Sequence, residues 1–365
     1  MIDEFYKIRG DLYFNVRDLE NVSNLMNIVR YTVTNSINTT FTAQASKMNC
    51  RTLSISTLTN GPNRNNEAQK MAIKNFAPFA GTARIQLMKT SHLNKKMLKQ
   101  CATQMIPPAW LFEVEDRKLK NTVDVQSIHG FGANRIAYSA VLKESCPELG
   151  CKGEERIVVK EYLVKKYTDD ELDERIRNYT HQTVCSGIAD YLATEFMKSK
   201  HSEKYPVTIS YVPAGIIRIA TKDENDNVNR SRVFNCEKFI KGKWQKFTNN
   251  VGDIFVDTVD IGNDKTVLNQ LLEFSIFTYE FTDGSMMVAD LQGEWVESTK
   301  TFNLTDPVIN CKNNMIFGNT NMTTIGIKKC LESYRNYLDS GAASDTSGVG
   351  TLTALASRVN NLKTN

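Results

Sequence analysis

Several features that would assign this chain of 365 residues to a specialised class of protein are missing from its sequence. No apolar run approaches the roughly 20 residues that a membrane-spanning helix needs, so we expect no membrane span. The net charge of +4, from 45 Lys and Arg against 41 Asp and Glu, is too slight to predict nucleic acid or an acidic membrane surface as a partner. Residues 1–4 are acidic and lack the pattern of a signal peptide. What remains is typical of a soluble globular protein, long enough for two domains or for one two-lobed domain with an extension.

Cysteine and histidine are present, but they are not grouped as a disulfide framework or a metal site would require. The eight cysteines are scattered along the chain, which predicts reduced, buried thiols in a cytoplasmic protein. Cys146 and Cys151 are separated by four residues, and no second Cys or His pair of similar spacing accompanies them. We therefore expect no zinc site at that pair and predict a cytoplasmic location.

A short apolar run at residues 286–289 is followed by two carboxylates and an amide. The run predicts a buried strand, after which Asp290 and Gln292 lie side by side and Gly293 turns the chain. Asp306 follows on a turn stiffened by proline. These are hard oxygen ligands of the kind that Mg²⁺ accepts when substrate phosphates complete its shell. Spacing alone leaves a second interpretation open, in which these are two ordinary turns, since Asp, Gly and Pro are common in loops.

Residues further upstream add a glycine loop and a lysine inside a strand. Gly130 and Gly132 lack a Cβ, so the backbone N–H groups of their loop can approach phosphate oxygens closely, and Arg135 can neutralise phosphate charge or brace the loop. A plain hairpin turn is the alternative. Lys160 lies in a β-branched run, where a lysine is unusual unless its ammonium reaches a partner. The alternative here is an edge-strand lysine that points to solvent.

These motifs, in this order, resemble those of the alpha-kinases, the atypical protein kinase family of the myosin heavy chain kinases. Asp-Leu-Gln-Gly at 290–293 with Leu-Thr-Asp-Pro at 304–307 resembles the paired signature of the C-lobe. Gly-Phe-Gly-Ala-Asn-Arg at 130–135 resembles the phosphate loop of the N-lobe, and Val-Val-Lys-Glu-Tyr at 158–162 resembles the lysine strand. Glu-Lys-Phe-Ile-Lys-Gly at 237–242 resembles the linker between the lobes.

The resemblance implies a two-lobed α+β fold of the protein-kinase-like, alpha-kinase type. It covers residues 105–338, with the N-lobe at about 105–236 and the C-lobe at about 242–338. Residues 1–104 are then an accessory N-terminal region, in which 79–84 copies the glycine loop superficially but is not followed by a lysine strand. Residues 339–365 read as a flexible tail with a short helix. Within the kinase-like part we expect a helix from 169 to about 200, a long hairpin of two strands at 207–219 and 233–240, and a buried helix around 267–277.

By the same resemblance, five residues contact the nucleotide. Lys160 is expected at the α- and β-phosphates of ATP, as kinase strand lysines are. Gly130, Gly132 and Arg135 form the phosphate loop, and Glu237 lies at the linker that faces the adenine. Glu195 is a possible ion-pair partner of Lys160 in the intervening helix, although a solvated glutamate is the expectation there.

The remaining assignments concern phosphoryl transfer itself. Gln292 and one aspartate are expected to bind Mg²⁺, while the other aspartate orients the acceptor hydroxyl. We favour Asp290 as the base and Asp306 as the metal ligand, and the sequence permits the exchange of these two roles. The catalytic residues are then Asp290, Lys160 and Asp306.

The chain also departs from the family pattern. The family's zinc ligands fall at Ile276 and near Tyr334, Asn336 and Ser340, none of which binds zinc, so we expect no structural zinc. Extra residues at 296–301 separate the two aspartates and must loop outward if both serve one metal. Thr320 and Thr323 stand in a loop where the family has more glycine.

The leading hypothesis is therefore an ATP-dependent protein serine/threonine kinase that transfers the γ-phosphate to a hydroxyl of a protein substrate. The departures motivate an alternative, a pseudokinase that binds nucleotide as a scaffold. A third possibility, an ATP-grasp-like ligase, shares the logic of a lysine with an acidic pair. The sequence gives no indication of the oligomeric state or the protein substrate.

Overall fold

The computed structural model describes residues 66–90, 92–104, 112–132, 135–163, 169–204, 207–222, 228–255, 266–313 and 316–339. The chain divides into two units, and Met1–Asn75 with Phe131–Asn134 form the first, where helix α4 (Asn66–Asn75) is described. The second unit, Phe76–Gly130 and Arg135–Asn365, holds the elements discussed below. The predicted tail helix within 340–365 lies outside the described residues.

The N-lobe is built on a seven-stranded sheet with the order β2-β1-β3-β4-β5-β8-β7. A further antiparallel pairing joins β1 to β7. The strands β1, β3, β4, β5, β8 and β7 therefore form a closed ring, and β2 is attached to β1 outside this ring. The closure leaves the lysine strand β5 paired on both sides, by β4 and by β8. The strands are β1 (Phe79–Lys89), β2 (Glu113–Lys118), β3 (Val123–Phe131), β4 (Arg135–Leu142), β5 (Glu155–Tyr162), β7 (Ala214–Lys222) and β8 (Val228–Lys238).

Strand β1 contains the sequence that superficially copies the glycine loop. Its Gly81 is a point of close strand approach, because a Cβ there would lie 2.4 Å from the carbonyl oxygen of Ala220 in β7. Helix α5 (Lys95–Gln104) follows and buries Leu98 and Cys101 in the same core as the C-lobe helices. Strand β1 therefore belongs to the N-lobe sheet, and α5 packs into the hydrophobic core of the C-lobe. We had predicted residues 1–104, which include both elements, to be an accessory region.

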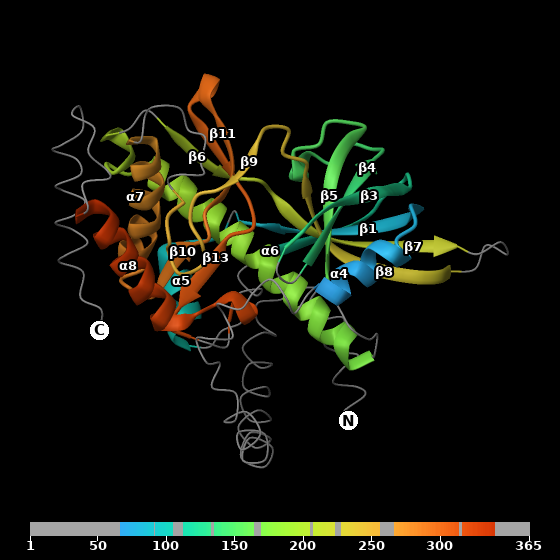
Figure 1. Cartoon of the computed structure of the whole chain (residues 1–365), viewed down its shortest axis with the longest axis horizontal. Helices are drawn as coiled ribbons and strands as arrows, with labels where there is room; N and C mark the ends of the chain where they lie inside the picture. The colour runs from blue at the N-terminus through green and yellow to red at the C-terminus, as the bar shows by residue number, and fades with distance from the viewer. Residues whose placement is uncertain are drawn as a thin grey trace, which may run out of the picture. The chain divides into compact units, whose positions relative to one another are not determined.

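Helix α6 (Asp169–Met197) matches the helix predicted from 169 to about 200. It runs along the strands of the N-lobe and continues into the C-lobe, as Figure 1 shows. Asn235 of β8 fastens the sheet to it, because the Asn235 side chain donates to the backbone oxygen of Tyr179 and to the hydroxyl of Thr183. Further along, Phe196 packs against the aromatic rings of α7.

The predicted long hairpin is real, but its first strand is shorter than predicted. Strands β7 and β8 pair antiparallel, as expected. The predicted run 207–219 is divided at Pro213, because proline has no N–H to donate to a sheet. The residues before it form β6 (Thr208–Tyr211), which pairs instead with the C-lobe strand β12 (Thr301–Leu304).

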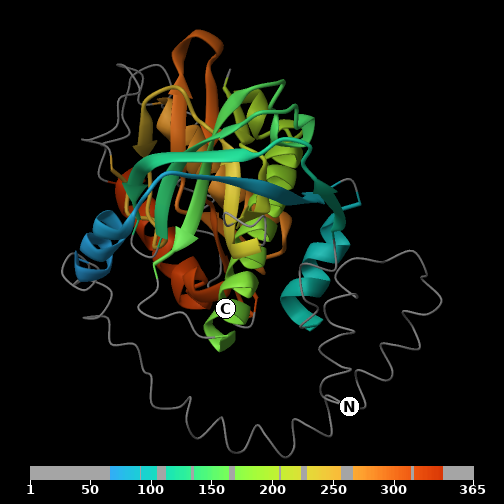
Figure 2. The ribbon, with the colours of Figure 1, turned by 90° about the vertical axis from the view of Figure 1, so that its right-hand side faces the viewer.

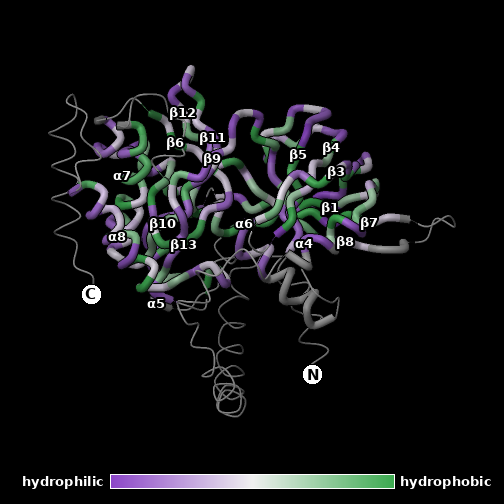
Figure 3. Tube along the Cα trace, viewed as in Figure 1, coloured by the Kyte–Doolittle hydropathy of each residue, from purple (hydrophilic) through white to green (hydrophobic). Residues whose placement is uncertain are grey.

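The C-lobe surrounds the buried helix α7 (Thr266–Phe281), which carries hydrophobic residues over much of its length (Figure 3). It is followed by β10 (Met286–Ala289), which pairs with β13 (Val308–Cys311), and by α8 (Thr323–Asp339). A second sheet has the order β6-β12-β11-β9, with β9 (Trp244–Lys246) and β11 (Gln292–Val296). The residues between the two aspartates form the β11–β12 hairpin, which projects outward in both Figure 1 and Figure 2, as predicted for the 296–301 insertion. The fold is α+β and two-lobed.

Candidate active site

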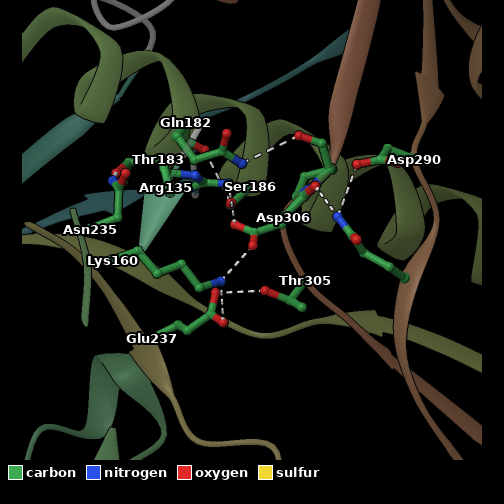
Figure 4. A network of polar contacts seen from close by, with 12 residues as sticks. Arg135, Lys160, Gln182, Thr183, Ser186, Asn235, Glu237, Asp290, Thr305 and Asp306 are labelled. Atoms are coloured by element: carbon green, nitrogen blue, oxygen red, sulfur yellow. Dashed lines mark hydrogen bonds and ion pairs between the residues drawn. The ribbon is translucent and has the colours of Figure 1, made fainter. Parts of the chain in front are cut away.

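Lys160 is the centre of a buried cluster of charges between the two lobes. It lies on β5, which is paired on both sides, and only 8% of its surface is exposed. Its ammonium donates to Glu237 Oε1 and to Asp306 Oδ2, each at 2.6 Å (Figure 4). The interpretation of Lys160 as a solvent-facing edge lysine is therefore excluded.

Glu237 lies near the end of β8 and is almost completely buried. One of its carboxylate oxygens accepts from Lys160, and the other accepts from the hydroxyl of Thr305 at 2.6 Å. Its side chain is thus committed to the lysine and to the turn that carries Asp306. Of the linker residues that we expected beside the adenine, Glu237 and Lys238 are the last two residues of β8, and residues 239–242 follow directly after it.

Asp306 bridges two cations. Its Oδ2 pairs with Lys160, and its Oδ1 pairs with Arg135 Nη2 at 3.1 Å. Burial alone would raise the pKa of this carboxyl, but Arg135 and Lys160 outweigh the burial and hold the pKa well below its usual range. The backbone of Asp306 has a φ of 49°, in the left-handed region that L-residues seldom adopt. This carboxylate is therefore ionised under all ordinary conditions and is held in a strained conformation.

Arg135 begins β4, directly after the glycine loop, and it has hydrogen-bonding capacity to spare. Its Nη1 is buried and has no hydrogen-bond partner among the described residues, while its Nη2 pairs with Asp306. A buried guanidinium nitrogen without an acceptor is costly, so this atom is suited to receive an anion. Gly130, at the end of β3, has open space where a Cβ would be, and Gly132 belongs to the first unit of the chain.

Asp290 and Gln292 flank the turn between β10 and β11. The Gln292 amide nitrogen donates to Asp290 Oδ2 and to the backbone oxygen of Asp306, each at 3.0 Å. The same glutamine thus links the two aspartates that the 296–301 insertion separates in the sequence. Asp290 also has a positive φ, of 58°. Both bonds use the amide nitrogen, which leaves the amide oxygen of Gln292 as the acceptor available to a ligand.

Lys246 is a site residue that the sequence analysis missed. It lies on β9 opposite Gln292, and its ammonium is 2.7 Å from Asp290 Oδ1. Burial raises the pKa of Asp290, and Lys246 lowers it but does not cancel the rise, so the pKa of Asp290 lies above its usual value. The signal that could have found Lys246 is the one used for Lys160, a lysine inside a short strand next to the motif residues.

The two aspartates therefore have opposite electrostatic environments. The pKa of Asp306 is lowered by two cations, which suits a permanent negative charge, while the pKa of Asp290 is raised by burial, which suits a group that accepts a proton. Divergent pKa values in neighbouring carboxylates are typical of a pair that divides acid–base and electrostatic roles.

The residues present fit a magnesium ion only in combination with a substrate. Asp306 and Gln292 supply a carboxylate and an amide oxygen, which are the hard ligands that Mg²⁺ prefers. In the described part of the chain, no group of three or more His, Cys, Asp or Glu residues is placed to hold a metal ion. The donor set is thus incomplete without oxygens from a bound molecule, as Mg²⁺ sites that are shared with phosphates are.

Two of the positions where the resemblance places zinc ligands lie deep in the C-lobe. Ile276 of α7 and Tyr334 of α8 are both completely buried in one hydrophobic core. The Tyr334 hydroxyl donates to Ser275 Oγ at 3.3 Å. The space is filled by these side chains, and the absence of zinc stays a prediction. Glu195 does not pair with Lys160 but with Lys198, which lies just past the end of α6.

Comparison with known proteins identifies the chain. The sequence profile of the alpha-kinase family matches residues 130–337, which is more than half of the chain. The chain belongs to the alpha-kinase family. Membership of this family supports its assignment as a protein kinase.

Among its relatives, the chain is 26% identical to alpha-protein kinase vwkA of Dictyostelium discoideum over 204 residues, which are 56% of this chain and 28% of that protein. It is 30% identical to myosin heavy chain kinase D of the same organism over 139 residues, 37% of this chain and 13% of that kinase. The chain thus spans less than a third of the length of each of these relatives.

Among solved structures, the chain is similar to the apoenzyme alpha-kinase domain of myosin-II heavy chain kinase A. The TM-score is 0.49 at 16% sequence identity, and the match covers 70% of this chain and 92% of that chain. An alpha kinase from Entamoeba histolytica gives a TM-score of 0.49 at 17% identity, over 71% of this chain and 87% of that chain. No helix in the described ranges is long and apolar enough to cross a membrane.

Proposed function

We propose that this alpha-kinase is an active, ATP-dependent protein serine/threonine kinase, which transfers the γ-phosphate of ATP to a hydroxyl of a protein substrate. The observation that carries the proposal is the meeting of Lys160 and Arg135, from the N-lobe, with Asp306, from the C-lobe, at 2.6 and 3.1 Å. In addition, Arg135 keeps a buried N–H group without an acceptor. Two converging cations and an unused donor are what a polyphosphate requires.

In this proposal the N-lobe binds the nucleotide. Lys160 contacts the α- and β-phosphates, and Arg135 with Gly130 and Gly132 forms the loop over the phosphates. Glu237 accepts a hydrogen bond from the Lys160 ammonium and so fixes its position. The linker that lies beside the adenine begins at Glu237. The catalytic domain runs from β1 to the end of α8, and we expect it to act in the cytoplasm.

The C-lobe supplies the groups for transfer. Asp290, whose pKa is raised, accepts a hydrogen bond from the acceptor hydroxyl and directs its oxygen at the phosphorus. Lys246 lies 2.7 Å from Asp290 and stabilises negative charge that develops on the transferred group. Gln292 and Asp306 would hold Mg²⁺, which supplies neutralisation of the phosphate charge.

The alternative, a pseudokinase, is favoured by one specific observation. Thr323 begins α8 with a φ of 58°, which is a strained conformation for a β-branched residue, in the loop where the family pattern has more glycine. A stiffened loop at this position would weaken substrate binding while it leaves the nucleotide site intact.

The test is to incubate the purified chain with Mg-ATP and a Thr-containing basic peptide, and to measure phosphate incorporation. We expect transfer by the wild type and its loss in both Lys160→Ala and Asp290→Ala. Lys198→Ala is the matched control, because Lys198 is an exposed lysine just past the end of α6 that pairs with Glu195. Thermal stabilisation by nucleotide without any transfer would establish the pseudokinase instead. ATP consumption that depends on an added carboxylate would establish the ATP-grasp-like ligase.

A further inference from the structure

Side chains from the two lobes are joined in one closed ring of contacts. Lys160 on β5 donates to Glu237 on β8 and to Asp306, each at 2.6 Å. The hydroxyl of Thr305 donates to the second oxygen of Glu237, also at 2.6 Å (Figure 4). Thr305 and Asp306 are neighbours in the C-lobe turn between β12 and β13, so the backbone between them closes the ring. We call Lys160, Glu237, Thr305 and Asp306 the inter-lobe ring.

Thr305 is a rigid part of this ring. Only 3% of its surface is exposed, and Glu237 is similarly enclosed at 6%, so bulk water does not compete for the hydrogen bond between them. A threonine hydroxyl has a single proton to donate, and here that proton is committed to the Glu237 carboxylate. Threonine also has few side-chain conformations, because its β-carbon is branched. The Thr305–Glu237 hydrogen bond therefore fixes one distance between the lobes.

The backbone of Thr305 is fixed on the side of the C-lobe. Its N–H donates to the carbonyl of Gln292 at 2.9 Å, and the Gln292 amide donates to the carbonyl of Asp306 at 3.0 Å. These bonds stabilise a turn in which Asp306 has a positive φ of 49°. The hydroxyl of Thr305 thus connects a turn that is firmly attached to β11 with a carboxylate on β8.

The contacts of the inter-lobe ring differ in how they respond to a nucleotide. In the proposed function, Lys160 contacts phosphates and Asp306 holds magnesium, so a bound nucleotide competes directly for the ion pair between them. Thr305 and Glu237 offer a nucleotide much less, because the hydroxyl already has an acceptor and the carboxylate repels phosphate. The Thr305–Glu237 hydrogen bond is therefore the part of the ring that persists when the ion pair is exchanged.

We propose that Thr305 is a positioning residue for phosphoryl transfer. Its hydroxyl fixes the separation of Lys160, the proposed phosphate ligand, from Asp306, the proposed magnesium ligand, after their direct ion pair has been given up to a nucleotide. Thr305 itself touches neither the nucleotide nor the acceptor hydroxyl. The inference rests on the proposed kinase function, because that function gives Lys160 and Asp306 these two roles.

The test in turnover compares two substitutions of the same residue. Thr305→Val replaces the hydroxyl with a methyl group of similar size, and we expect kcat to fall about tenfold, which corresponds to about 1.4 kcal/mol in the barrier. The KM for the peptide should stay within about twofold of the wild type, because Asp290 and Lys246 lie outside the inter-lobe ring. Thr305→Ser keeps the hydroxyl and should retain activity close to the wild type. Thr301→Val is the matched control, because the Thr301 hydroxyl donates to the carbonyl of Thr299 within the β11–β12 hairpin.

Two results of this comparison overturn the proposal. A kcat of Thr305→Val equal to that of Thr301→Val would show that the hydroxyl has no part in transfer. Equal losses in Thr305→Val and Thr305→Ser would show that the site responds to any change of this side chain, rather than to the loss of the hydroxyl.

A third substitution keeps the test decisive if Thr305→Val does not fold, since valine leaves a buried oxygen of Glu237 without a donor. Thr305→Ala leaves room for a water molecule to donate to that oxygen. A water molecule is not attached to the C-lobe backbone, so it satisfies Glu237 without fixing the separation of the lobes. We therefore expect a folded protein, as judged by its thermal unfolding midpoint, with the same loss of kcat of about tenfold. A kcat equal to that of the wild type would refute the role of the hydroxyl.

A measurement without turnover separates this inference from the proposed function. Isothermal titration with ATP, first in excess EDTA and then with magnesium, gives the factor by which added magnesium strengthens ATP binding. We expect this factor to be about tenfold smaller in Thr305→Val than in the wild type and in Thr301→Val. Binding of Mg-free ATP should change by less than about twofold, because Lys160 and Arg135 are both retained.

The binding factor also gives a clear outcome if no turnover is seen. If the wild type binds Mg-ATP but transfers no phosphate to the peptide, the proposed function fails, and the factor still decides whether Thr305 positions Asp306. An equal factor in Thr305→Val and the wild type refutes the inference. A wild type whose ATP affinity does not depend on magnesium refutes it as well.

Discussion

Asp306→Asn should strengthen the binding of ATP in the absence of magnesium, although it removes a residue of the active site. In the structure, the Asp306 carboxylate occupies Lys160 at 2.6 Å and Arg135 at 3.1 Å, which are the cations proposed for the phosphates. A triphosphate must take these cations away from Asp306 and must also approach its negative charge. The asparagine variant has no such competitor, and Lys160 keeps Glu237 as its partner.

The magnitude follows from the hydrogen bonds that must be exchanged. A hydrogen bond to a charged group contributes about 1.5–3 kcal/mol in a protein. The side chains of Lys160, Arg135 and Asp306 are 10%, 19% and 21% exposed, so solvent screens their interactions only a little. The lower end of this range, about 1.5 kcal/mol for a single hydrogen bond, is therefore a conservative estimate of the binding energy that the variant gains. Since about 1.4 kcal/mol is a factor of ten in Kd, Mg-free ATP should bind at least about tenfold more tightly to the variant.

The assay is isothermal titration of ATP in excess EDTA, with Asp290→Asn as the control. Asp290 contacts Gln292 and Lys246 but neither nucleotide-binding cation, so its variant should bind Mg-free ATP as the wild type does. Equal or weaker binding by Asp306→Asn would refute the view that Asp306 competes with phosphate. With magnesium present, the same variant should lose turnover.

Stability against acid gives a second readout of the same ion pairs. The pKa of Asp306 is held below its unfolded value of about 3.9, so its stabilising contribution is present above that pH and is lost as the pH falls toward the folded-state pKa. Asp306→Asn should therefore unfold more easily at neutral pH, and the difference from the wild type should shrink in acid.

Three further predictions concern single residues. Lys246→Met should move the acid limb of the pH–kcat profile to higher pH. Lys246 lowers the pKa of Asp290, so its removal raises that pKa, and the base acts only when it is ionised. An acid limb at the wild-type pH would contradict Asp290 as the titrating group. Gly293→Ala should prevent stable folding, as judged by the thermal unfolding midpoint. The φ of Gly293 is 150°, and a Cβ there would lie 2.1 Å from the Asn303 carbonyl oxygen. An unfolding midpoint equal to that of the wild type would show that the turn relaxes freely. Thr323→Gly should raise the midpoint by roughly 2–4 °C, because relief of its strained φ stabilises the fold by about 1 kcal/mol; a lower midpoint would show that the threonine side chain contributes more than its strain costs.

The parts of the site that could be predicted are those in which a few neighbouring residues carry the chemistry. Lys160 was identifiable because a lysine inside a β-branched run needs a partner, and the structure brings it to Asp306. Asp290 and Gln292 were identifiable because they follow a buried strand directly. Helix α6 was predictable from its apolar spacing and begins at the predicted residue.

The parts that could not be predicted depend on contacts between distant segments. The pairing of β1 with β3 and β7 joins residues that are far apart in the chain, so residues 79–89 gave no local sign of belonging to the N-lobe sheet. The direction of the Glu237 side chain depends on where Thr305 lies, and Lys246 becomes a site residue only because β9 pairs with β11. The positive φ of Asp290 is also invisible in the sequence, because aspartate adopts many conformations.

The closed ring of N-lobe strands has a practical consequence for anyone who shortens this protein. A chain that begins at residue 105 would lack β1, the strand that seals the gap between β3 and β7. Both of those strands would then present unpaired backbone donors and acceptors, which readily pair with other molecules and lead to aggregates. Expression of the isolated catalytic part should therefore start ahead of Phe76, and insolubility of a shorter fragment would say nothing about whether the enzyme is active.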